Sequence, residues 1–185
     1  MSEPRRFEPT PVRAVVLIHQ EGALALVAAV GLSFTADGLL PALAASGPGT
    51  TAVAAGIGAG AAWSGLLWLV RGLPPLARLE RWQRVLVSGW TTTDAAAVAL
   101  LSGLAEEALL RAWLQPVIGL VPAAALFALL HIVPDRRLWF WPVFAFVTGL
   151  GLGGLYEAFG YPAAAVAHVT VNLVALLRLR RGGGD

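Results

Sequence analysis

Long hydrophobic runs alternate along this chain with short polar segments that hold most of its arginines. A helix needs roughly 20 apolar residues to cross a hydrocarbon core about 30 Å thick, and several runs approach or reach that length. We therefore predict an all-α membrane protein, a polytopic helical bundle of about six transmembrane helices. The expected spans cover residues 12–34, 51–70, 91–115, 120–133, 138–156 and 161–179, and the first is expected to continue toward residue 43.

Prolines and arginines mark the expected boundaries. Pro116 is predicted to end the third span and Pro134 to close the fourth, because proline cannot continue a helix without losing a backbone hydrogen bond. The segment 71–84 holds two prolines and four arginines and is predicted as a loop or interfacial helix. The chain is thus divided into a cytoplasmic N-terminal arm, N-terminal transmembrane helices with an Arg/Pro-rich loop, a helical core and a flexible C-terminal tail, over residues 1–13, 14–90, 91–179 and 180–185.

Composition strengthens the membrane prediction and removes several classes of function. Hydrophobic residues make up 57% of the 185 residues and charged residues 13%, and the mean hydropathy is +0.72, unlike a soluble domain. The chain has no cysteine, which excludes disulfides, thiolate metal sites and a cysteine nucleophile. A net charge of only +2, with arginines placed at segment ends, argues against nucleic acid as a partner. No removable signal peptide is expected.

The distribution of arginine predicts the topology. Three arginines precede the first span, none lies between the first and second, four lie between the second and third, two between the fourth and fifth, and three at the end. The positive-inside rule then places both termini in the cytoplasm. Because every basic residue is arginine and the chain is rich in alanine and glycine, we expect a bacterial protein of the inner membrane, surrounded by the lipid bilayer.

Several polar side chains interrupt the apolar runs of the core. An ionisable group at membrane depth is unfavourable unless it is paired or hydrated, so each is a candidate functional residue. Residues four apart share one face of a helix, so Glu107 is expected to pair with Arg111 as structural support. Glu106 is rotated about 100° from Glu107 and is predicted to be the free carboxylate.

Two further motifs carry imidazoles. His131 lies one turn after Phe127, and His168 shares a helix face with Asn172. Counted along their helices at 1.5 Å per residue, Glu106, His131 and His168 all fall roughly 10 to 17 Å from the same membrane face. We therefore expect them to converge, with Glu106 as general base on a water molecule and His131 beside it. His168 and Asn172 would donate hydrogen bonds to the oxygen that becomes negative, which describes amide hydrolysis inside the membrane.

Other polar residues have simpler interpretations. Phe127 is expected to pack in the core and to support the site without taking part in chemistry. His19 and Glu21, near the start of the first span, are interpreted as interfacial residues, although His19 could line a polar cavity. Glu157 is interpreted as part of a solvated helix end.

The ordered motifs Glu-Glu-x-x-x-Arg, Phe-x-x-x-His and His-x-x-x-Asn resemble those of the CPBP family of membrane proteins, also called the CAAX-protease or Abi family. The resemblance covers about residues 90–178. It implies an all-helical intramembrane endopeptidase in which Glu106 and His131 activate water while His168 and Asn172 stabilise the oxyanion. No cofactor is expected on the glutamate-protease view, and zinc is the alternative, with Glu106, His131 and His168 as its ligands. Many relatives have Phe-Arg-Gly where this chain has Leu110-Arg111-Ala112, which puts the local packing in question.

The resemblance leaves the substrate open. A membrane-associated protein or peptide is implied, with CAAX-like processing or trimming of a C-terminal sorting tail as the two kinds of reaction. A non-catalytic immunity or scaffold protein of the same fold is the main alternative function. A second alternative is a small transporter that uses the ionisable groups as a proton relay. Two halves of the chain with related sequences would favour a transporter, and the sequence shows no such repeat. The oligomeric state is not predicted.

Overall fold

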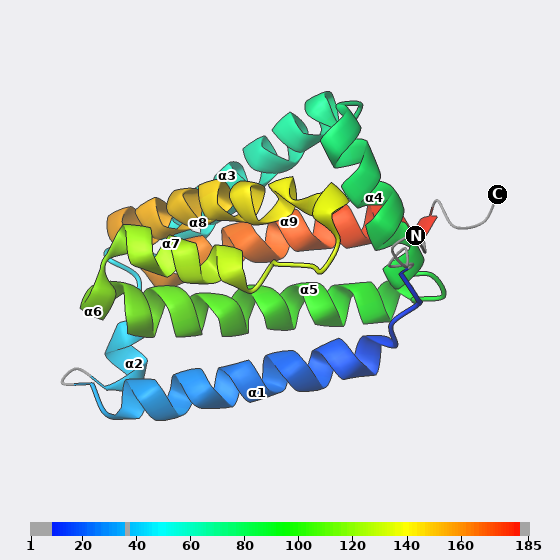
Figure 1. The fold of residues 1–185 in the computed structure, drawn as a ribbon. Helices are drawn as coiled ribbons and strands as arrows, with labels where there is room; N and C mark the ends of the chain where they lie inside the picture. The colour runs from blue at the N-terminus through cyan, green and yellow to red at the C-terminus, as the bar shows by residue number, and fades with distance from the viewer. Residues whose placement is uncertain (1–8, 36–37, 182–185) are drawn as a thin grey trace.

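A computed structural model describes residues 9–35 and 38–181, and in these ranges the chain is helical, with one isolated β-bridge between Ala45 and Gly160 as its only strand-like pairing. Most of the N-terminal arm and the tail beyond residue 181 lie outside the described residues. Figure 1 shows the elements in order along the chain. They are α1 (Ala14–Ser33), α2 (Leu39–Ala42), α3 (Gly49–Val70), α4 (Pro74–Leu86), α5 (Thr92–Glu107), the π-helix η1 (Ala108–Leu114), α6 (Gln115–Ile118), α7 (Leu120–Leu129), the short 3-10 helix η2 (Arg136–Leu138), α8 (Phe140–Phe159) and α9 (Tyr161–Arg181).

Four helical segments are long and apolar enough to cross a membrane: α1, α3, α8 together with η2, and α9. The prediction of an all-α integral membrane protein is confirmed. Of the two remaining expected spans, the third is a continuous helical run of α5, η1 and α6, interrupted by charged residues. The fourth, α7, has ten residues and is about 15 Å long, so it cannot cross a hydrocarbon core about 30 Å thick.

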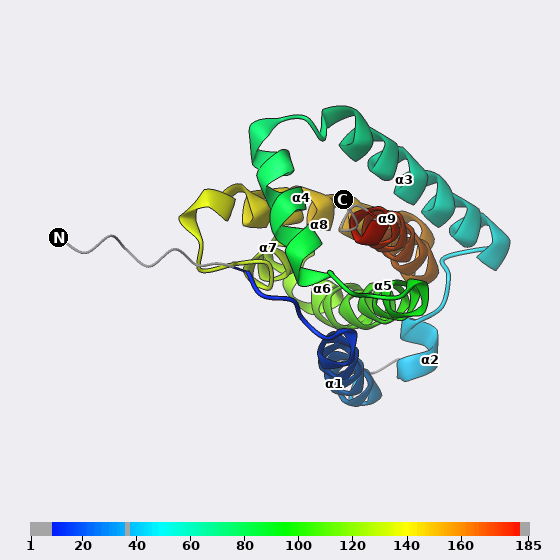
Figure 2. The same cartoon turned by 90° about the vertical axis from the view of Figure 1, so that its right-hand side faces the viewer.

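Helix α9 lies at the centre of the bundle (Figure 2). Helices α3, α5 and α8 pack against α9, α1 packs on the outer side of α5 and η1, and α7 packs on α8. Small residues allow this close packing: a Cβ atom at Gly60 of α3 would lie 2.8 Å from the Ala167 oxygen of α9. Gly103 of α5 plays the same part, because a Cβ there would lie 2.7 Å from the Val169 nitrogen.

The arginine-rich segments gather at one end of the bundle. The segment predicted as a loop or interfacial helix is the amphipathic helix α4, which lies across this end, and the start of α1 and the end of α9 are there too (Figure 1). Glu80 of α4 pairs with Arg84 of the same helix and, at 2.7 Å, with Arg178 of α9. The Trp90 indole N–H donates to the Val12 carbonyl at 2.7 Å. This last bond holds the starts of α1 and α5 at the same level.

The third span does not end at Gln115 as expected. Pro116 lies in the first turn of α6, and the helical run continues to Ile118, where Gly119 ends it with a φ of 88°. The π-helix just before Pro116 has its hydrogen bonds one residue out of the α register. Proline is tolerated in the first turn of a new α-helical register, because the N–H that it lacks would have no partner there in any case.

The fourth helix ends earlier than expected. It stops at Leu129, so His131 lies two residues beyond the helix and not inside it. The residue before a proline disfavours the α conformation, and Pro134 therefore limits how far the helix can extend. The N-terminal spans also differ slightly at their ends: α1 stops at Ser33, and the stretch toward residue 43 forms the separate short helix α2.

Candidate active site

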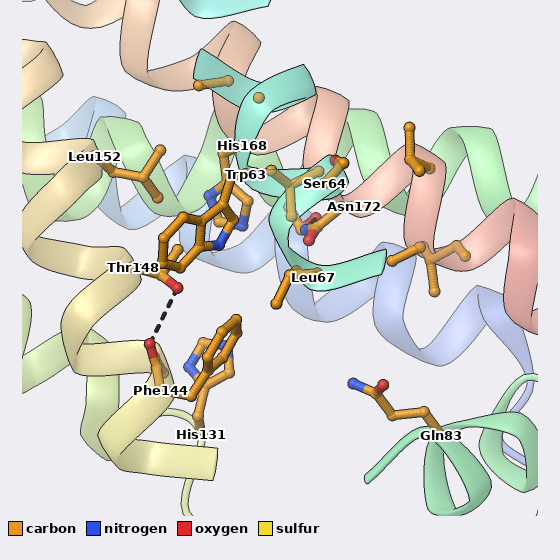
Figure 3. A pocket seen from close by; sticks show the side chains of 18 of the residues that line it. Trp63, Ser64, Leu67, Gln83, His131, Phe144, Thr148, Leu152, His168 and Asn172 are labelled. Carbon is orange, nitrogen blue, oxygen red and sulfur yellow. Dashed lines mark hydrogen bonds between the residues drawn. The ribbon is translucent and has the colours of Figure 1, made fainter. Parts of the chain in front are cut away.

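A cavity of about 740 Å³ lies between the helices of the bundle, and all four residues predicted to be catalytic line it. They come from three different parts of the chain: Glu106 from α5, His131 from the segment after α7, and His168 and Asn172 from α9. Figure 3 shows the two imidazoles and Asn172 around the cavity, with Trp63, Ser64 and Leu67 of α3 on another wall. The structure therefore brings together the three motifs that are separate in the sequence.

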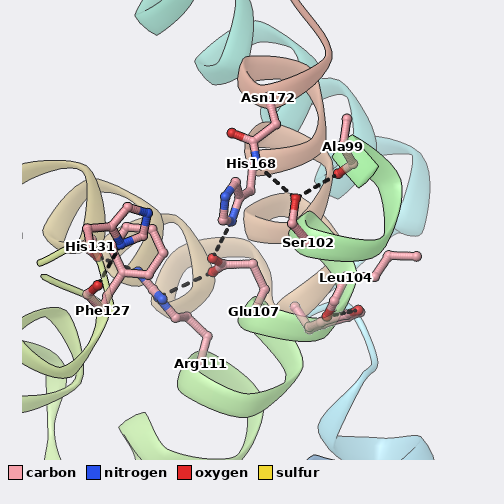
Figure 4. Close-up of polar contacts among 11 residues, drawn as sticks. Ala99, Ser102, Leu104, Glu107, Arg111, Phe127, His131, His168 and Asn172 are labelled. Carbon is pink, nitrogen blue, oxygen red and sulfur yellow. Dashed lines mark hydrogen bonds and ion pairs between the residues drawn. The ribbon is translucent and has the colours of Figure 1, made fainter. Parts of the chain in front are cut away.

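A buried ion-pair network lies directly behind the cavity (Figure 4). Glu107 and Arg111 have side chains that are 0% exposed, and the Arg111 Nε lies 3.2 Å from one carboxylate oxygen of Glu107. The other carboxylate oxygen lies 2.8 Å from Nδ1 of His168. Arg111 also donates from Nη2 to the Gly149 carbonyl at 3.0 Å, which joins α8 to the network. Glu107 thus has Arg111 as its ion-pair partner and His168 as its hydrogen-bond partner, whereas the neighbouring Glu106 faces the cavity.

The contact with Glu107 determines which nitrogen of His168 can act in the cavity. An ionised carboxylate only accepts hydrogen bonds, so Nδ1 of His168 must carry a proton and donate it to Glu107. The other nitrogen, Nε2, is left for a group in the cavity. When the ring is protonated, Nε2–H becomes a second donor, and the Glu107 carboxylate offsets the added positive charge.

Asn172 is held by a residue that the sequence analysis did not identify. Its Nδ2 donates to the Ser102 hydroxyl oxygen at 2.9 Å, and the Ser102 hydroxyl donates to the Ala99 carbonyl at 3.3 Å (Figure 4). An amide nitrogen carries two hydrogens, so one N–H of Asn172 remains available to a ligand. Ser102 thus fixes the orientation of the amide at the cavity wall.

His131 leaves the same ring nitrogen free as His168 does. Its Nδ1 lies 2.8 Å from the Phe127 carbonyl oxygen, which can only accept, so Nδ1 carries the proton and neutral Nε2 is a hydrogen-bond acceptor. The ring packs at 4.6 Å from the Phe127 ring and 5.6 Å from the Trp141 ring. The early end of α7 makes this possible, since the Phe127 carbonyl is among the last of the helix and has no partner within it.

Phe127 packs in the core, as predicted. It is 2% exposed, it lies beneath the Arg111 guanidinium at 4.8 Å, and it contacts the His168 ring edge-on. Leu110 is also buried and belongs to the same cluster as Phe127 and Ala145. Leu110, Arg111 and Ala112 are therefore all buried and well packed, although this chain lacks the phenylalanine and glycine of the Phe-Arg-Gly sequence.

Glu106 is half-buried, and its Oε2 atom has no hydrogen-bond partner among the described residues. A buried carboxylate oxygen without a partner is unfavourable in an apolar surrounding, so a water molecule or a substrate group is needed to satisfy it. Glu107, which lies next to it in the sequence, differs because one of its oxygens is hydrogen-bonded to His168 and the other lies in an ion pair with Arg111.

The interpretation of Glu21 as an interfacial residue is wrong. Its side chain is buried, with 6% exposure, and it lines the same cavity as Glu106. His19 is exposed, as expected for an interfacial residue, and bonds to the carbonyl of its own helix. The signal for Glu21 was present in the sequence, because it lies inside a run long enough to cross the membrane. Which way it faced depended on α1 packing against α5.

The predicted zinc ligands do not form a metal-binding set. No group of three His, Cys, Asp or Glu residues within 9–35 and 38–181 is placed to hold a metal ion. Glu106, His131 and His168 are thus not grouped as three metal ligands among the described residues, and a reaction without metal is part of the proposal below.

Comparison with known proteins gives one match. Residues 88–174 match a family model described as type II CAAX prenyl endopeptidase Rce1-like, and all three motifs fall inside this range. No curated protein and no solved structure matches the chain. The match confirms the resemblance to the CAAX-protease family, and the four apolar helices agree with a membrane protein. Residues 88–174, just under half of the chain, are therefore similar to the Rce1-like family of type II CAAX prenyl endopeptidases.

Proposed function

We propose that this protein is an active intramembrane endopeptidase that hydrolyses a peptide bond of a membrane-associated protein or peptide with its own side chains and no metal ion. The observation that carries the proposal is the unpartnered Glu106 oxygen in a cavity that two imidazoles also line. A protein that only binds a peptide has no need of a free carboxylate there, whereas a hydrolase needs a base. The family match supports peptidase chemistry in general.

Glu106 and His131 are proposed to activate the water molecule. The carboxylate takes one proton of the water, and neutral Nε2 of His131 accepts a hydrogen bond from the other O–H. The water oxygen then attacks the carbonyl carbon of the scissile amide and forms a tetrahedral intermediate. Glu106 afterwards returns its proton to the amide nitrogen as the C–N bond breaks, which releases an amine and a carboxylic acid.

His168 and Asn172 are proposed to stabilise the negative oxygen of that intermediate. The free N–H of Asn172 donates to it, and so does Nε2–H of His168 when the ring is protonated. Both donors are fixed before the substrate arrives, Asn172 by Ser102 and His168 by Glu107. Donors that need no rearrangement contribute most where water is excluded, and removing a single one of this kind typically lowers kcat by about 100- to 1000-fold.

The surroundings of the cavity support a substrate that lies within the bilayer. Large hydrophobic side chains are exposed along the outer faces of α1, α3 and α8, where lipid would contact them. We propose the inner membrane of a bacterium as the location, with the arginine-rich end of the bundle in the cytoplasm. The proposed substrates carry a CAAX-like end or a C-terminal sorting tail.

The experiment that tests the proposal compares membrane proteins from cells that hold wild-type protein with those from a Glu106→Gln strain. We expect longer precursors of specific membrane-associated proteins to accumulate in the variant, with their N- or C-terminal ends identified by mass spectrometry. A Glu157→Gln strain is the matched control, because Glu157 is exposed and does not line the cavity. Unchanged protein ends in a Glu106→Gln strain that still complements the deletion phenotype would favour a non-catalytic scaffold.

A further inference from the structure

Glu21 is the buried ionisable group that the proposed reaction does not use. It lies in the middle of α1, its side chain is 6% exposed, and it lines the cavity. Its Oε2 atom has no hydrogen-bond partner, and none of the described residues forms an ion pair with it. An intramembrane carboxylate of this kind normally faces a pathway or a ligand that satisfies it.

The arginines nearest the cavity are bound by other groups. Arg71, which lines the cavity, donates to the Trp68 carbonyl and lies over the Trp68 ring. Arg111 is bound by Glu107 and by the Gly149 carbonyl. Arg178, which lines the arginine-rich end of the cavity, is paired with Glu80. Glu21 also interacts electrostatically with Glu106, which repels it, and with His168, which attracts it when protonated, so two carboxylates and one imidazole face the same cavity. A positively charged group that entered this space would be attracted by both carboxylates.

The position of Glu21 relative to Glu106 can be worked out from the helices. Helices α1 and α5 run side by side from the same end (Figure 1), where the bond from Trp90 to Val12 keeps their starts level. Glu21 lies seven residues after the start of α1, and Glu106 lies fourteen residues after the start of α5. Glu106 is thus deeper by about two turns, or about 10 Å. An extended peptide covers that distance in about three residues.

We propose that Glu21 is a substrate-recognition residue that binds a basic side chain, lysine or arginine, located about three residues from the scissile bond. The inference rests on the proposed function, because the distance from Glu21 to the scissile bond is counted from Glu106, where that function places the bond. It adds a substrate class: an otherwise apolar membrane peptide with one cation near the cleavage site. A buried carboxylate that binds a cation in an apolar cavity discriminates strongly against a neutral side chain, because the neutral substrate leaves it unpaired.

The test uses the full-length protein in lipid nanodiscs and two series of quenched-fluorescence peptides. Each peptide is an apolar alanine/leucine sequence that carries one lysine, or one norleucine of the same shape, at successive positions. Binding is measured by fluorescence anisotropy and cleavage by kcat and KM, for wild-type protein, Glu21→Gln and the control Glu157→Gln. Thermal unfolding checks that Glu21→Gln is folded, which we expect because the change removes an unpaired buried charge and preserves the shape.

We expect the wild-type protein and Glu157→Gln to bind and cleave the lysine peptide at the matching position at least about tenfold better than its norleucine counterpart, with the difference in KM. Glu21→Gln should reduce this preference to about twofold or less and should leave kcat on the norleucine peptide nearly unchanged. Cleavage of both series equally well by wild-type protein would overturn the recognition role and leave the proposed function standing. Lysine-dependent binding that requires Glu21, without cleavage of any peptide, would instead count against the proposed function. Neither binding preference nor cleavage would overturn both.

Discussion

Replacing Arg111 by methionine would keep the apolar stem of the side chain and remove the charge that pairs with Glu107. Both side chains are fully buried, so the Glu107 carboxylate would be left with His168 as its one remaining partner. Breaking one side of a buried ion pair typically costs about 3 to 5 kcal/mol, because the remaining charge stays buried. The change also removes the hydrogen bond to the Gly149 carbonyl. For a chain of 185 residues, we expect the unfolding midpoint to fall by about 6 to 20 °C.

The assay is thermal unfolding in detergent, followed by the fluorescence of the seven tryptophans. Two further variants make the result specific to the ion pair. The double variant Glu107→Gln/Arg111→Met removes both charges, so it should recover a large part of the lost stability. Glu106→Gln should change the midpoint little, because the Glu106 Oε2 atom has no partner to lose.

Two outcomes would refute this reasoning. If Glu106→Gln destabilised the protein as much as Arg111→Met, the assignment of Glu107 as the structural glutamate and Glu106 as the free one would be wrong. If the double variant were less stable than the wild-type protein by the sum of the losses in Arg111→Met and Glu107→Gln, the two side chains would not be coupled and the network would not act as a unit.

Two other predictions follow from the packing and from the donor geometry. Gly60→Ala should lower the unfolding midpoint and the activity, because the new Cβ would lie 2.7 Å from the Thr170 Cβ of α9. The control is Gly58→Ala on the same helix, whose new Cβ meets no atom within 4 Å. Equal effects of the two substitutions would contradict the assigned interface between α3 and α9. A strong chelator should leave cleavage unchanged and the purified protein should hold no stoichiometric zinc, because the described residues provide no three-ligand set; activity that is lost to chelation and restored by zinc would show that the mechanism proposed here is wrong.

Features that depend on local helical geometry could be predicted from the sequence. The apolar runs are long enough to require helices in a membrane, and the fold class follows from them. The spacing of four residues between Glu107 and Arg111 brings them together on any regular helix, and the structure contains that ion pair. The separation of Glu106 from Glu107 by about 100° likewise follows from the helix itself.

Features that depend on which helices pack together could not be predicted in the same way. The bond between His168 and Glu107 joins residues 61 positions apart, and that between Asn172 and Ser102 joins residues 70 apart. Both depend on the close approach of α9 to α5, which Gly103 permits. The position of Glu21 is the clearest case, since an interfacial residue and a cavity residue near a helix start look alike until the neighbouring helix is known.

The sequence by itself thus determined the membrane class, the helical periodicity and the candidate residues of the site, because these follow from the bilayer thickness and from the backbone geometry of one helix. Only the tertiary structure decided where α7 ends, which nitrogen each histidine offers, and that Glu21 joins Glu106 at the cavity. Those properties arise from contacts between distant segments. The free energy of such contacts depends on packing across helices, which no local pattern of residues specifies.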